Sequence, residues 1–368
     1  MKLIILKNNL KSGLDAVGRA IGTNLNLPIL GNILIKAESN QINFSATNLE
    51  LAITKTIYGK IVESGTTTVP YNVLSNIISN LTSERVNIEI KDSNLHITTD
   101  SYEATLQSTP DNEFPIIPKI KETNESIKIN STVLKEAINK VIVAAGISDL
   151  RPEISGILLI GEQSAIKLVA TDSFRLAECK ITKSQFTNTF EKEIKAIIPL
   201  KTTQELLRVI KDDEEIVIKI EGGQILLKTG DTEIVSRLID GKFPDYDAIV
   251  PKSVDTEVLV SREELMGAVK LTGSFTSRVS DVRIRIKDKK AIEIYSNDSS
   301  LGENNYLVPA KITGESMELA FNWRYLLDGA KTMSSKQIVI GLNVNNKPAI
   351  IKSPEDTSCF YVLMPIRQ

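Results

Sequence analysis

The stretch SIKINSTVLKEAINKVIVAAG, residues 126–146, decides the fold. Ile127 and Ile129 alternate with polar neighbours, which predicts a half-buried strand. Asn130, Ser131 and Thr132 then offer N-cap oxygens, and Gly146 is the expected end of a helix. Between the caps, apolar side chains fall on one helical face, namely Leu134, Ala137, Ile138, Val141, Ile142 and Ala145. The stretch therefore predicts a strand followed by an amphipathic helix.

The same unit occurs three times. KLIILKNNLKSGLDAVGRAIG begins at residue 2, and TEVLVSREELMGAVKLTG begins at residue 256, where Ser261 and Glu264 have capping-box spacing. Each copy continues with a strand pair, a second helix and a hairpin. The pattern predicts an α+β protein of three repeated domains, each with two helices backed by antiparallel sheets of about eight short strands. We place these domains at 1–122, 123–250 and 251–368.

Three hairpins fix the alignment of the repeats. Their turns are predicted at Asp92-Ser93-Asn94, Gly222-Gly223 and Asn345-Asn346. Ile88, Ile218 and Ile340 occupy matching positions just before these turns, and Ala46-Thr47-Asn48, Ala170-Thr171-Asp172 and Ser296-Asn297-Asp298 match in the preceding strand pairs. Like units joined by short connectors either continue as an array or close into a ring.

Composition bounds the function. The chain has 368 residues, 42% of them hydrophobic and 24% charged, which is typical of a globular protein of two or three domains. We expect neither a transmembrane helix nor a signal peptide, because the apolar runs are too short. Cys179 and Cys359 lack metal-ligand spacing, and two thiols in so long a chain indicate a reducing, cytoplasmic setting.

Charge is distributed unevenly along the chain. The formal net charge is −2, yet the six predicted helices carry 16 Lys and Arg against 7 Asp and Glu. Amphipathic helices often display lysines on a solvated face, so this excess has an ordinary explanation. It also allows a basic helical surface on an otherwise acidic protein.

Signals of catalysis are nearly absent. We expect no metal site and no cofactor, because phosphate-binding loops, nucleophile turns and clustered Cys or His ligands are missing from the sequence. The single histidine, His96, is expected on the surface of a strand. Asp172 and Arg175 are interpreted as a structural ion pair, with an acid–base pair as the alternative. Arg283, Arg285 and Lys287 alternate on one strand face, where they either solubilise the sheet or contact phosphate.

Four motifs carry a resemblance to a known family. LPILGN at 27–32, ATDSFRLA at 170–177, LIDGKFPDY at 238–246 and YVLMPIRQ at 361–368 resemble the bacterial DNA polymerase III beta subunits, the sliding clamps. The resemblance spans the chain in the family's order. It implies a head-to-tail homodimeric ring around double-stranded DNA, bound without sequence preference. It also implies no enzymatic activity and partners that include the DNA polymerase III alpha subunit, the clamp loader and other proteins with a clamp-binding motif.

The resemblance further implies a peptide-binding cleft between the second and third domains. The matching positions here are Ile154, Thr171, Phe174, Arg175, Leu176, Pro244, Ile249, Asn322, Tyr325, Val362, Leu363, Met364, Pro365, Ile366 and Arg367. Ser173-Phe174 departs from the family's usual Gly-His, so the cleft is expected to be bulkier. For Leu176 and Val362, an ordinary core position is the better interpretation from the residues alone.

Two more surfaces complete the expectations. Helix faces suggest the DNA-facing residues Lys11, Arg19, Lys135, Lys140, Lys201 and Arg208. The resemblance pairs Tyr102–Gln107 of one subunit with the region around Leu271–Phe275 of the other, with Leu106 and Phe275 as apolar contacts. The alternatives are a monomeric repeat scaffold that binds peptides without enclosing DNA, and an enzyme that uses Asp172 and Arg175.

Overall fold

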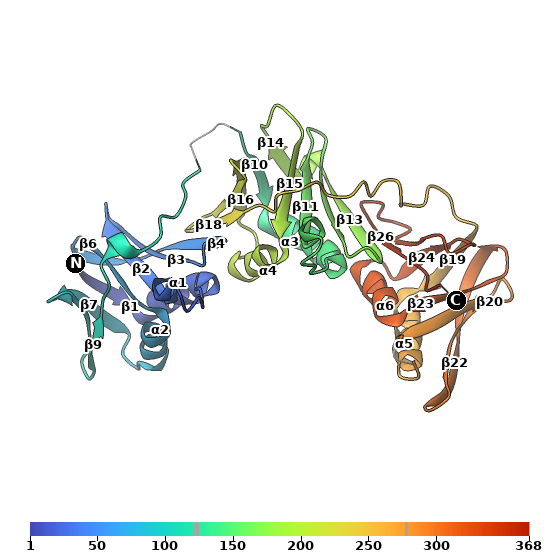
Figure 1. The fold of residues 1–368 in the computed structure, drawn as a ribbon, viewed down its shortest axis with the longest axis horizontal. Helices are drawn as coiled ribbons and strands as arrows, with labels where there is room; N and C mark the ends of the chain where they lie inside the picture. The colour runs from blue at the N-terminus through green and yellow to red at the C-terminus, as the bar shows by residue number, and fades with distance from the viewer. Residues whose placement is uncertain (121–124, 277–278, 368) are drawn as a thin grey trace. The chain divides into compact units, whose positions relative to one another are not determined.

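The computed structural model describes residues 1–120, 125–276 and 279–367, so the predicted boundary between Glu122 and Thr123 lies outside the described residues. Within them, one order of elements recurs three times: a strand and a helix, a run of strands, a second helix and three closing strands (Figure 1). The predicted three-repeat α+β fold is confirmed. No described helix is long and apolar enough to cross a membrane.

The first repeat contains the helices α1 (Lys7–Val17) and α2 (Tyr71–Asn80). Its strands are β1 (Lys2–Leu6), β2 (Asn32–Glu38), β3 (Gln41–Thr47), β4 (Leu51–Ile57), β5 (Gly59–Glu63), β6 (Gly65–Pro70), β7 (Arg85–Lys91), β8 (Asn94–Thr98) and β9 (Glu103–Gln107). Its 3₁₀ turns are η1 (Gly18–Ala20), η2 (Pro28–Gly31) and η3 (Asp111–Glu113).

The second repeat contains the helices α3 (Ser131–Val141) and α4 (Leu200–Val209). Its strands are β10 (Ile127–Asn130), β11 (Gly156–Gly161), β12 (Ala165–Thr171), β13 (Arg175–Thr182), β14 (Phe186–Asn188), β15 (Ile194–Pro199), β16 (Glu215–Glu221), β17 (Gln224–Thr229) and β18 (Thr232–Arg237). Its 3₁₀ turns are η4 (Ile142–Ala144), η5 (Pro152–Ile154) and η6 (Lys183–Gln185).

The third repeat contains the helices α5 (Arg262–Gly273) and α6 (Trp323–Thr332). Its strands are β19 (Thr256–Ser261), β20 (Asp281–Ile286), β21 (Ala291–Asp298), β22 (Gly302–Gly314), β23 (Met317–Asn322), β24 (Gln337–Leu342), β25 (Ala349–Lys352) and β26 (Cys359–Leu363). The long strand β22 takes the places that β4 and β5 hold in the first repeat.

The predicted hairpin turns and the predicted cap of α5 are present in the structure. The three hairpin turns use left-handed backbone, with φ of 48° and 61° at Asp92 and Ser93, and similar values at Gly222-Gly223 and Asn345-Asn346. Two consecutive left-handed residues match the twist of the flanking strands. At the start of α5, Ser261 Oγ accepts a hydrogen bond from the Glu264 backbone N–H at 3.4 Å.

The predicted end of the central helix is wrong. Helix α3 stops at Val141, and the chain tightens into the 3₁₀ turn η4 before it reaches Gly146. Gly146 instead permits a close approach, because a Cβ there would lie 2.8 Å from the Cβ of Asp172. The glycine thus serves packing against the second repeat's strand pair and does not cap the helix.

One compact unit comprises Met1–Thr132, Thr187–Glu191 and Gln204–Leu238. It holds a five-stranded sheet, in the order β5-β1-β7-β8-β9, and a nine-stranded sheet, in the order β14-β10-β16-β17-β18-β4-β3-β2-β6. Helices α1 and α2 pack on each other, and α1 also packs on β3 and β4 (Figure 1). Their apolar faces, including Leu10, Leu14 and Leu74, are fully buried, and each such side chain contributes roughly 1.5–3 kcal/mol.

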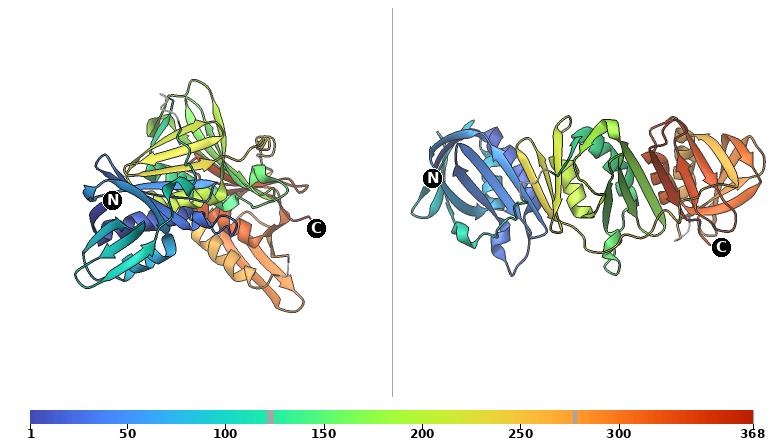
Figure 2. Two further views of the ribbon diagram at one scale, coloured as in Figure 1. Left: turned by 60° about the vertical axis from the view of Figure 1, so that its left-hand side comes forward. Right: turned by 90° about the horizontal axis from the view of Figure 1, so that it is seen from above.

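The second compact unit comprises Val133–Phe186, Lys192–Thr203 and Ile239–Gln368. Its twelve strands form the order β15-β11-β12-β13-β26-β25-β24-β19-β22-β21-β20-β23. Figure 2 shows the ribbon of the chain from two further sides. Helices α5 and α6 pack together, with α5 on β21 and β22 and α6 on β23 and β26. Gly273 ends α5 against the Trp323 ring, where a Cβ would lie 2.8 Å from the indole.

Each unit contains a ladder that crosses from one repeat to the next. Strand β18 of the second repeat pairs with β4 of the first, and β26 of the third pairs with β13 of the second. In the β18–β4 ladder, Lys55 lies opposite Thr232. The Lys55 ammonium, 5% exposed, forms an ion pair with Asp231 and donates to Thr232 Oγ1 at 2.8 Å. Burial would raise the pKa of Asp231, but the hydrogen bond and charge of Lys55 hold that pKa below its ordinary value.

We expect Lys55→Met to lower the free energy of unfolding by about 2 kcal/mol, because it leaves the Asp231 carboxylate partly buried without its cation. Urea denaturation followed by circular dichroism measures the loss. Because Lys55 depresses the pKa of Asp231, its stabilisation is present above the ordinary Asp pKa of about 4 and is lost as the pH falls through the lowered value.

The matched control is Lys60→Met, on an exposed residue of β5. It should leave the urea midpoint unchanged. Equal midpoints for the two variants would show that the Lys55 ion pair does not stabilise the ladder.

Candidate protein-binding and DNA-facing surfaces

Arg175, at the start of β13, contacts residues of both the second and the third repeat, the two that are predicted to form the peptide site. Its Nε lies 2.9 Å from Asp172 Oδ2, and its Nη1 lies 2.7 Å from Asp328 Oδ2 on α6. The guanidinium also lies over the ring of Tyr325, 4.2 Å from the centroid. The interpretation of Asp172 and Arg175 as an ion pair is confirmed, and the pair extends into the third repeat.

The loop before β13 positions Arg175. Asp172 Oδ1 accepts hydrogen bonds from the backbone N–H groups of Phe174 and Arg175, both at 3.0 Å. This closes an Asx turn, in which Ser173 adopts a left-handed φ of 76°. The turn leaves the Phe174 side chain 61% exposed. The bulky residue predicted for this site thus faces solvent.

Burial and neighbouring charges shift the pKa values of Arg175 and of the nearby Tyr361. Burial raises the pKa of the Tyr361 hydroxyl above its ordinary value, and the nearby Arg175 offsets this only in part. For Arg175, burial lowers the pKa, but Tyr361, Asp328 and Asp172 outweigh burial and the pKa lies above its ordinary value. The site therefore presents a permanently charged guanidinium beside a neutral phenol.

The predicted peptide-site residues divide into a buried and an accessible set. Leu176 and Val362 are 2% and 3% exposed and belong to an apolar cluster with Phe243 and Tyr246, as the core interpretation expected. The other buried members are Ile154, Thr171, Leu363 and Pro365. The members at least partly open to solvent are Phe174, Arg175, Pro244, Ile249, Asn322, Tyr325, Met364, Ile366 and Arg367.

Backbone hydrogen bonds tie the last residues to both repeats. The Met364 N–H donates to the Phe174 carbonyl at 2.8 Å, and the Ile366 N–H donates to the Ala320 carbonyl at 2.7 Å. Asn322 has a local role, since its side-chain oxygen caps α6 by accepting from the Arg324 N–H at 3.0 Å. These contacts place Met364 beside Phe174 and Ile366 beside β23, within the second unit.

Sequence reasoning missed three contributors to this surface. Asp328 carried no local signal, because its partner Arg175 is 153 residues away. Phe243 and Tyr246 lay within the LIDGKFPDY motif but were not assigned to the site. They pack against strand residues that include Leu158, Val169 and Leu176. Burial raises the pKa of Glu178, and burial together with Glu178 raises the pKa of Tyr246.

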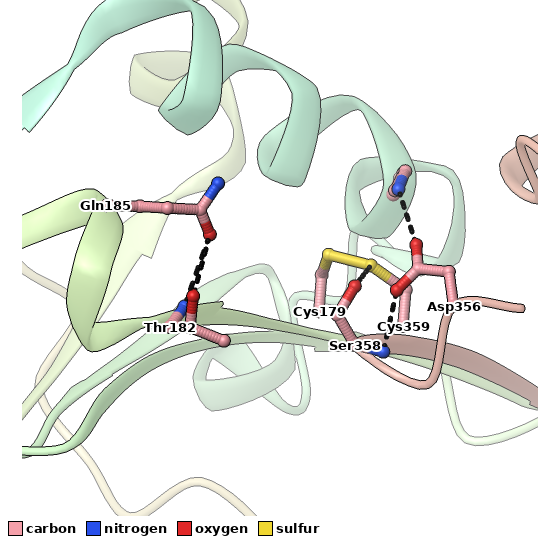
Figure 3. The surroundings of a disulfide bond; sticks show 7 residues. Cys179, Thr182, Gln185, Asp356, Ser358 and Cys359 are labelled. Carbon is pink, nitrogen blue, oxygen red and sulfur yellow. Dashed lines mark hydrogen bonds and ion pairs between the residues drawn. A yellow bond between two sulfur atoms is a disulfide. The ribbon is translucent and has the colours of Figure 1, made fainter.

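The expectation of two separate thiols is wrong. Cys179 and Cys359 form a disulfide between β13 and β26, with their Cα atoms 4.1 Å apart (Figure 3). The two residues lie directly opposite in the ladder, a relation that a separation of 180 residues hides in the sequence. Ser358 and Asp356 flank the bond, and Asp356 pairs with Lys140 at 3.6 Å. The inference of a reducing setting from free thiols therefore loses its basis.

The predicted DNA-facing residues lie on the first helices and turns of the repeats and on α4. Lys11 on α1 and Lys201 on α4 are exposed. Glu205 pairs with two of the others, Arg208 at 2.8 Å and Arg19 at 4.0 Å. The remaining two are Lys135 and Lys140, both half-buried on α3. The six positive charges are thus partly compensated by local carboxylates.

Two of the unpaired strand edges among the described residues belong to β9 and to the first half of β22. Strand β9 pairs only with β8 and ends the five-stranded sheet. The first half of β22 pairs with β21 alone, whereas its last residues pair with β19. Exposed apolar side chains belong to β22, to the turn before it and to α5, which packs on it, namely Tyr306, Leu307, Leu301 and Leu271. Leu106 of β9 is buried, and Phe275 is half-buried.

Comparisons with known proteins assign the family. Models of the DNA polymerase III beta subunit match residues 1–118 (N-terminal domain), 128–245 (central domain) and 247–367 (C-terminal domain). The chain belongs to the DNA polymerase III beta subunit family. Beta sliding clamps of Bacillus subtilis and Synechococcus elongatus are 28% and 27% identical, in alignments that cover 100% of this chain and 100% and 99% of those proteins.

Solved clamp structures agree with this beta-subunit assignment. The sliding clamp of Bacillus subtilis matches with a TM-score of 0.96 at 26% identity, covering 100% of this chain and 99% of that one. The Pseudomonas aeruginosa clamp bound to griselimycin matches with a TM-score of 0.94 at 26% identity and full coverage of both chains. The predicted family is confirmed, and it is a family of replication processivity factors.

We expect a dithiol reductant to lower the free energy of unfolding of this beta subunit by about 2–4 kcal/mol, because the Cys179–Cys359 bond closes a long loop in the unfolded chain. Thermal unfolding with and without reductant measures the shift, and non-reducing peptide mapping should recover the two cysteines in one linked pair. The Cys179→Ser/Cys359→Ser variant is the control and should not respond to reductant. An equal response from this variant would contradict the prediction.

Proposed function

We propose that two copies of this chain join head to tail into a closed ring around duplex DNA and tether the replicative polymerase and other partners. The ring would act without catalysing a reaction, in the cytoplasm where a bacterial chromosome is replicated. The domains proposed for it are 1–122, 123–250 and 251–368. The observation that supports the proposal is that one kind of strand pairing joins both pairs of successive domains, β18 with β4 and β26 with β13.

The two ladders within the chain have the same register. Ile53 lies opposite Ile234 in the first ladder, and Ala177 lies opposite Tyr361 in the second. Residues 53 and 177 are separated by the same 124 residues as the matching Ala46 and Ala170. Ile234 and Tyr361 are likewise equivalent. Each is reached from its domain's matched isoleucine, Ile218 or Ile340, by crossing the next two strands rung by rung. One rule therefore describes both junctions.

The same rule assigns partners to the two unpaired edges. The first domain's β9 is the equivalent of β18 and β26, and the first half of β22 is the equivalent of β4 and β13. Ser296 pairs with Asn304 as Ala46 pairs with Ile53 and Ala170 with Ala177. Applied between two chains, the register therefore places Ala104 opposite Asn304, Leu106 opposite Gly302, and Tyr102 opposite Tyr306. Unpaired edges with exposed apolar neighbours favour such pairing.

Enclosure explains why so little positive charge suffices. A ring that cannot dissociate from circular DNA needs no base contacts, and phosphate contacts alone carry no sequence information. Lys11, Arg19, Lys135, Lys140, Lys201 and Arg208 are the proposed DNA-facing residues. Glu205 and Asp356 form ion pairs with three of them, Arg19, Arg208 and Lys140, which favours contacts that exchange as the ring slides.

The proposed peptide site is the accessible surface around Arg175 and Met364. Half-buried apolar side chains with a fixed guanidinium suit a short segment anchored by Leu or Phe. Exposed Phe174 adds an aromatic face at its rim. The expected partners are the DNA polymerase III alpha subunit, the clamp loader and other proteins that carry such a segment.

We expect the ring, once placed on nicked circular DNA, to stay bound through gel filtration at salt concentrations that remove ordinary electrostatic binding. Cutting the circle should release it, because linear DNA lets a ring slide off. Loading requires the appropriate clamp loader or a high protein concentration. Equal retention on circular and linear DNA, or none on either, would contradict enclosure.

We expect Tyr102→Cys/Tyr306→Cys to form a covalent dimer under mild oxidation. These positions are the intermolecular equivalents of the rung that holds Cys179 and Cys359. Non-reducing electrophoresis of the purified dimer measures the yield.

The register control is Tyr102→Cys/Asn305→Cys, since neighbouring strand residues point to opposite faces of a sheet. It should cross-link poorly. A monomer by light scattering at micromolar concentration, or equal cross-linking of both variants, would overturn the proposed junction.

A further inference from the structure

A second groove lies in the first unit, on the outward face of the nine-stranded sheet. Strands β16, β17, β18, β4, β3 and β2 form its floor, and the segment 114–120 forms its wall. Its volume is about 730 Å³. A smaller hollow of about 90 Å³ adjoins it and shares Ala52, Pro115, Ile116, Pro118 and Val235 with it. The two together form one continuous groove at the junction of the first and second domains.

This groove is the internal equivalent of the proposed peptide site. Thr47 and Ala52 correspond to Thr171 and Leu176, each 124 residues later, in strands that hold the same rungs of the two ladders. Val235 and Arg237 correspond to Val362 and Met364 in the facing strands. On the connecting segments, Pro115 and Ile120 correspond to Pro244 and Ile249. The fold has thus built the same kind of surface at both junctions.

The groove is more open than its equivalent. At the second junction, Phe243 and Tyr246 pack onto the sheet and the larger Leu176 fills the floor. At the first junction, Phe114 is buried, but Ile116 is 94% exposed and the floor carries only Ala52 at the matching position. Leu34, Val217 and Leu226 extend the floor and remain half-buried. Apolar surface therefore stays available beside an exposed apolar side chain.

Charges around the groove favour an acidic segment. Two of its carboxylates are compensated, since Lys36 pairs with Glu38 at 2.9 Å and Lys228 pairs with Glu233 at 2.5 Å. The other ionised groups in the lining are the cations Lys119, Lys219 and Arg237 and the carboxylates of Glu50 and Asp111. Cations in the lining thus exceed carboxylates by five to four. Lys219 lies on β16, at one end of the floor, directly opposite Leu226 of β17.

We propose that this groove is a second peptide-binding site, which takes a short extended segment of a partner protein with Leu or Phe anchors and at least one carboxylate. Apolar anchors would cover Ala52, Val235 and Leu226, and the carboxylate would lie near Lys219. The proposal rests on the proposed peptide-binding function and extends it to a second site per chain. The ring would then offer two docking positions of different affinity on each subunit.

Methyl-detected NMR of the full chain, labelled at Ile δ1 and Met ε methyl groups, tests this with the peptide acetyl-Asp-Leu-Asp-Leu-Phe-amide. Titration should shift Met364, in the first proposed site, and separately Ile116, Ile117 and Ile120, in the groove. Lys219→Glu should weaken the groove response about two- to fivefold and leave the Met364 response unchanged. The matched control Lys60→Glu, at an exposed position outside the groove, should change neither.

The outcomes separate the two proposals. A shift of Met364 alone would overturn the second site and leave the proposed function standing, whereas no shift in either set would count against both. A groove response that is insensitive to Lys219→Glu would overturn the choice of an acidic segment. A response of Ile116 to protein concentration without peptide would assign the groove to a second copy of the chain and overturn the proposal.

Discussion

The structure depends on strand pairing between one repeat and the next. A ladder runs from β18 to β4 and another from β26 to β13, and both keep one register. Backbone N–H and C=O groups at a strand edge need partners, so each domain is complete only when its neighbour supplies a strand. A chain of three such domains necessarily ends with one donor strand and one acceptor strand unpaired. A second copy in head-to-tail orientation satisfies both edges.

The same rung carries different chemistry at each junction. Lys55 and Thr232 occupy it in the first ladder, where Asp231 completes a buried ion pair. Cys179 and Cys359 occupy it in the second and form a disulfide. Both junctions within the chain thus have a cross-link in addition to the backbone ladder. Each also has a connecting segment that lies over its sheet, and these additions make the internal junctions permanent.

Much of the fold could be predicted from the sequence because its determinants are local. The hairpin turns at Asp92-Ser93 and Gly222-Gly223 require particular backbone conformations, and alternating Ile residues mark the strands beside them. Helix ends were less predictable. Gly146 was expected to end a helix, but the glycine is needed for a close contact with Asp172 from another part of the chain. Periodicity reports which residues are buried but not which distant residue covers them.

The candidate site shows the same limit more sharply. Arg175 and Asp172 are three residues apart, and their pairing was predicted; Asp328 is 153 residues from Arg175, and no local pattern marks it. The disulfide escaped prediction for the same reason, since only the register of β13 against β26 brings the two cysteines together. The family resemblance implied the surface as a whole. It did not distinguish its core members, such as Leu176, from accessible ones such as Phe174.

A ring that encloses DNA must also open, and the differences between the junctions indicate where. An internal junction has a covalent connector and a second bond at the shared rung, so separating it would break the ladder and that bond together. The proposed intermolecular junction has a ladder of a few rungs and, at the equivalent rung, Tyr102 and Tyr306, which can form neither an ion pair nor a disulfide. Pairing between two chains also costs translational and rotational entropy that the internal junctions do not incur. The weakest contact in the ring is therefore the one between subunits, and opening there admits DNA while each three-domain chain stays intact.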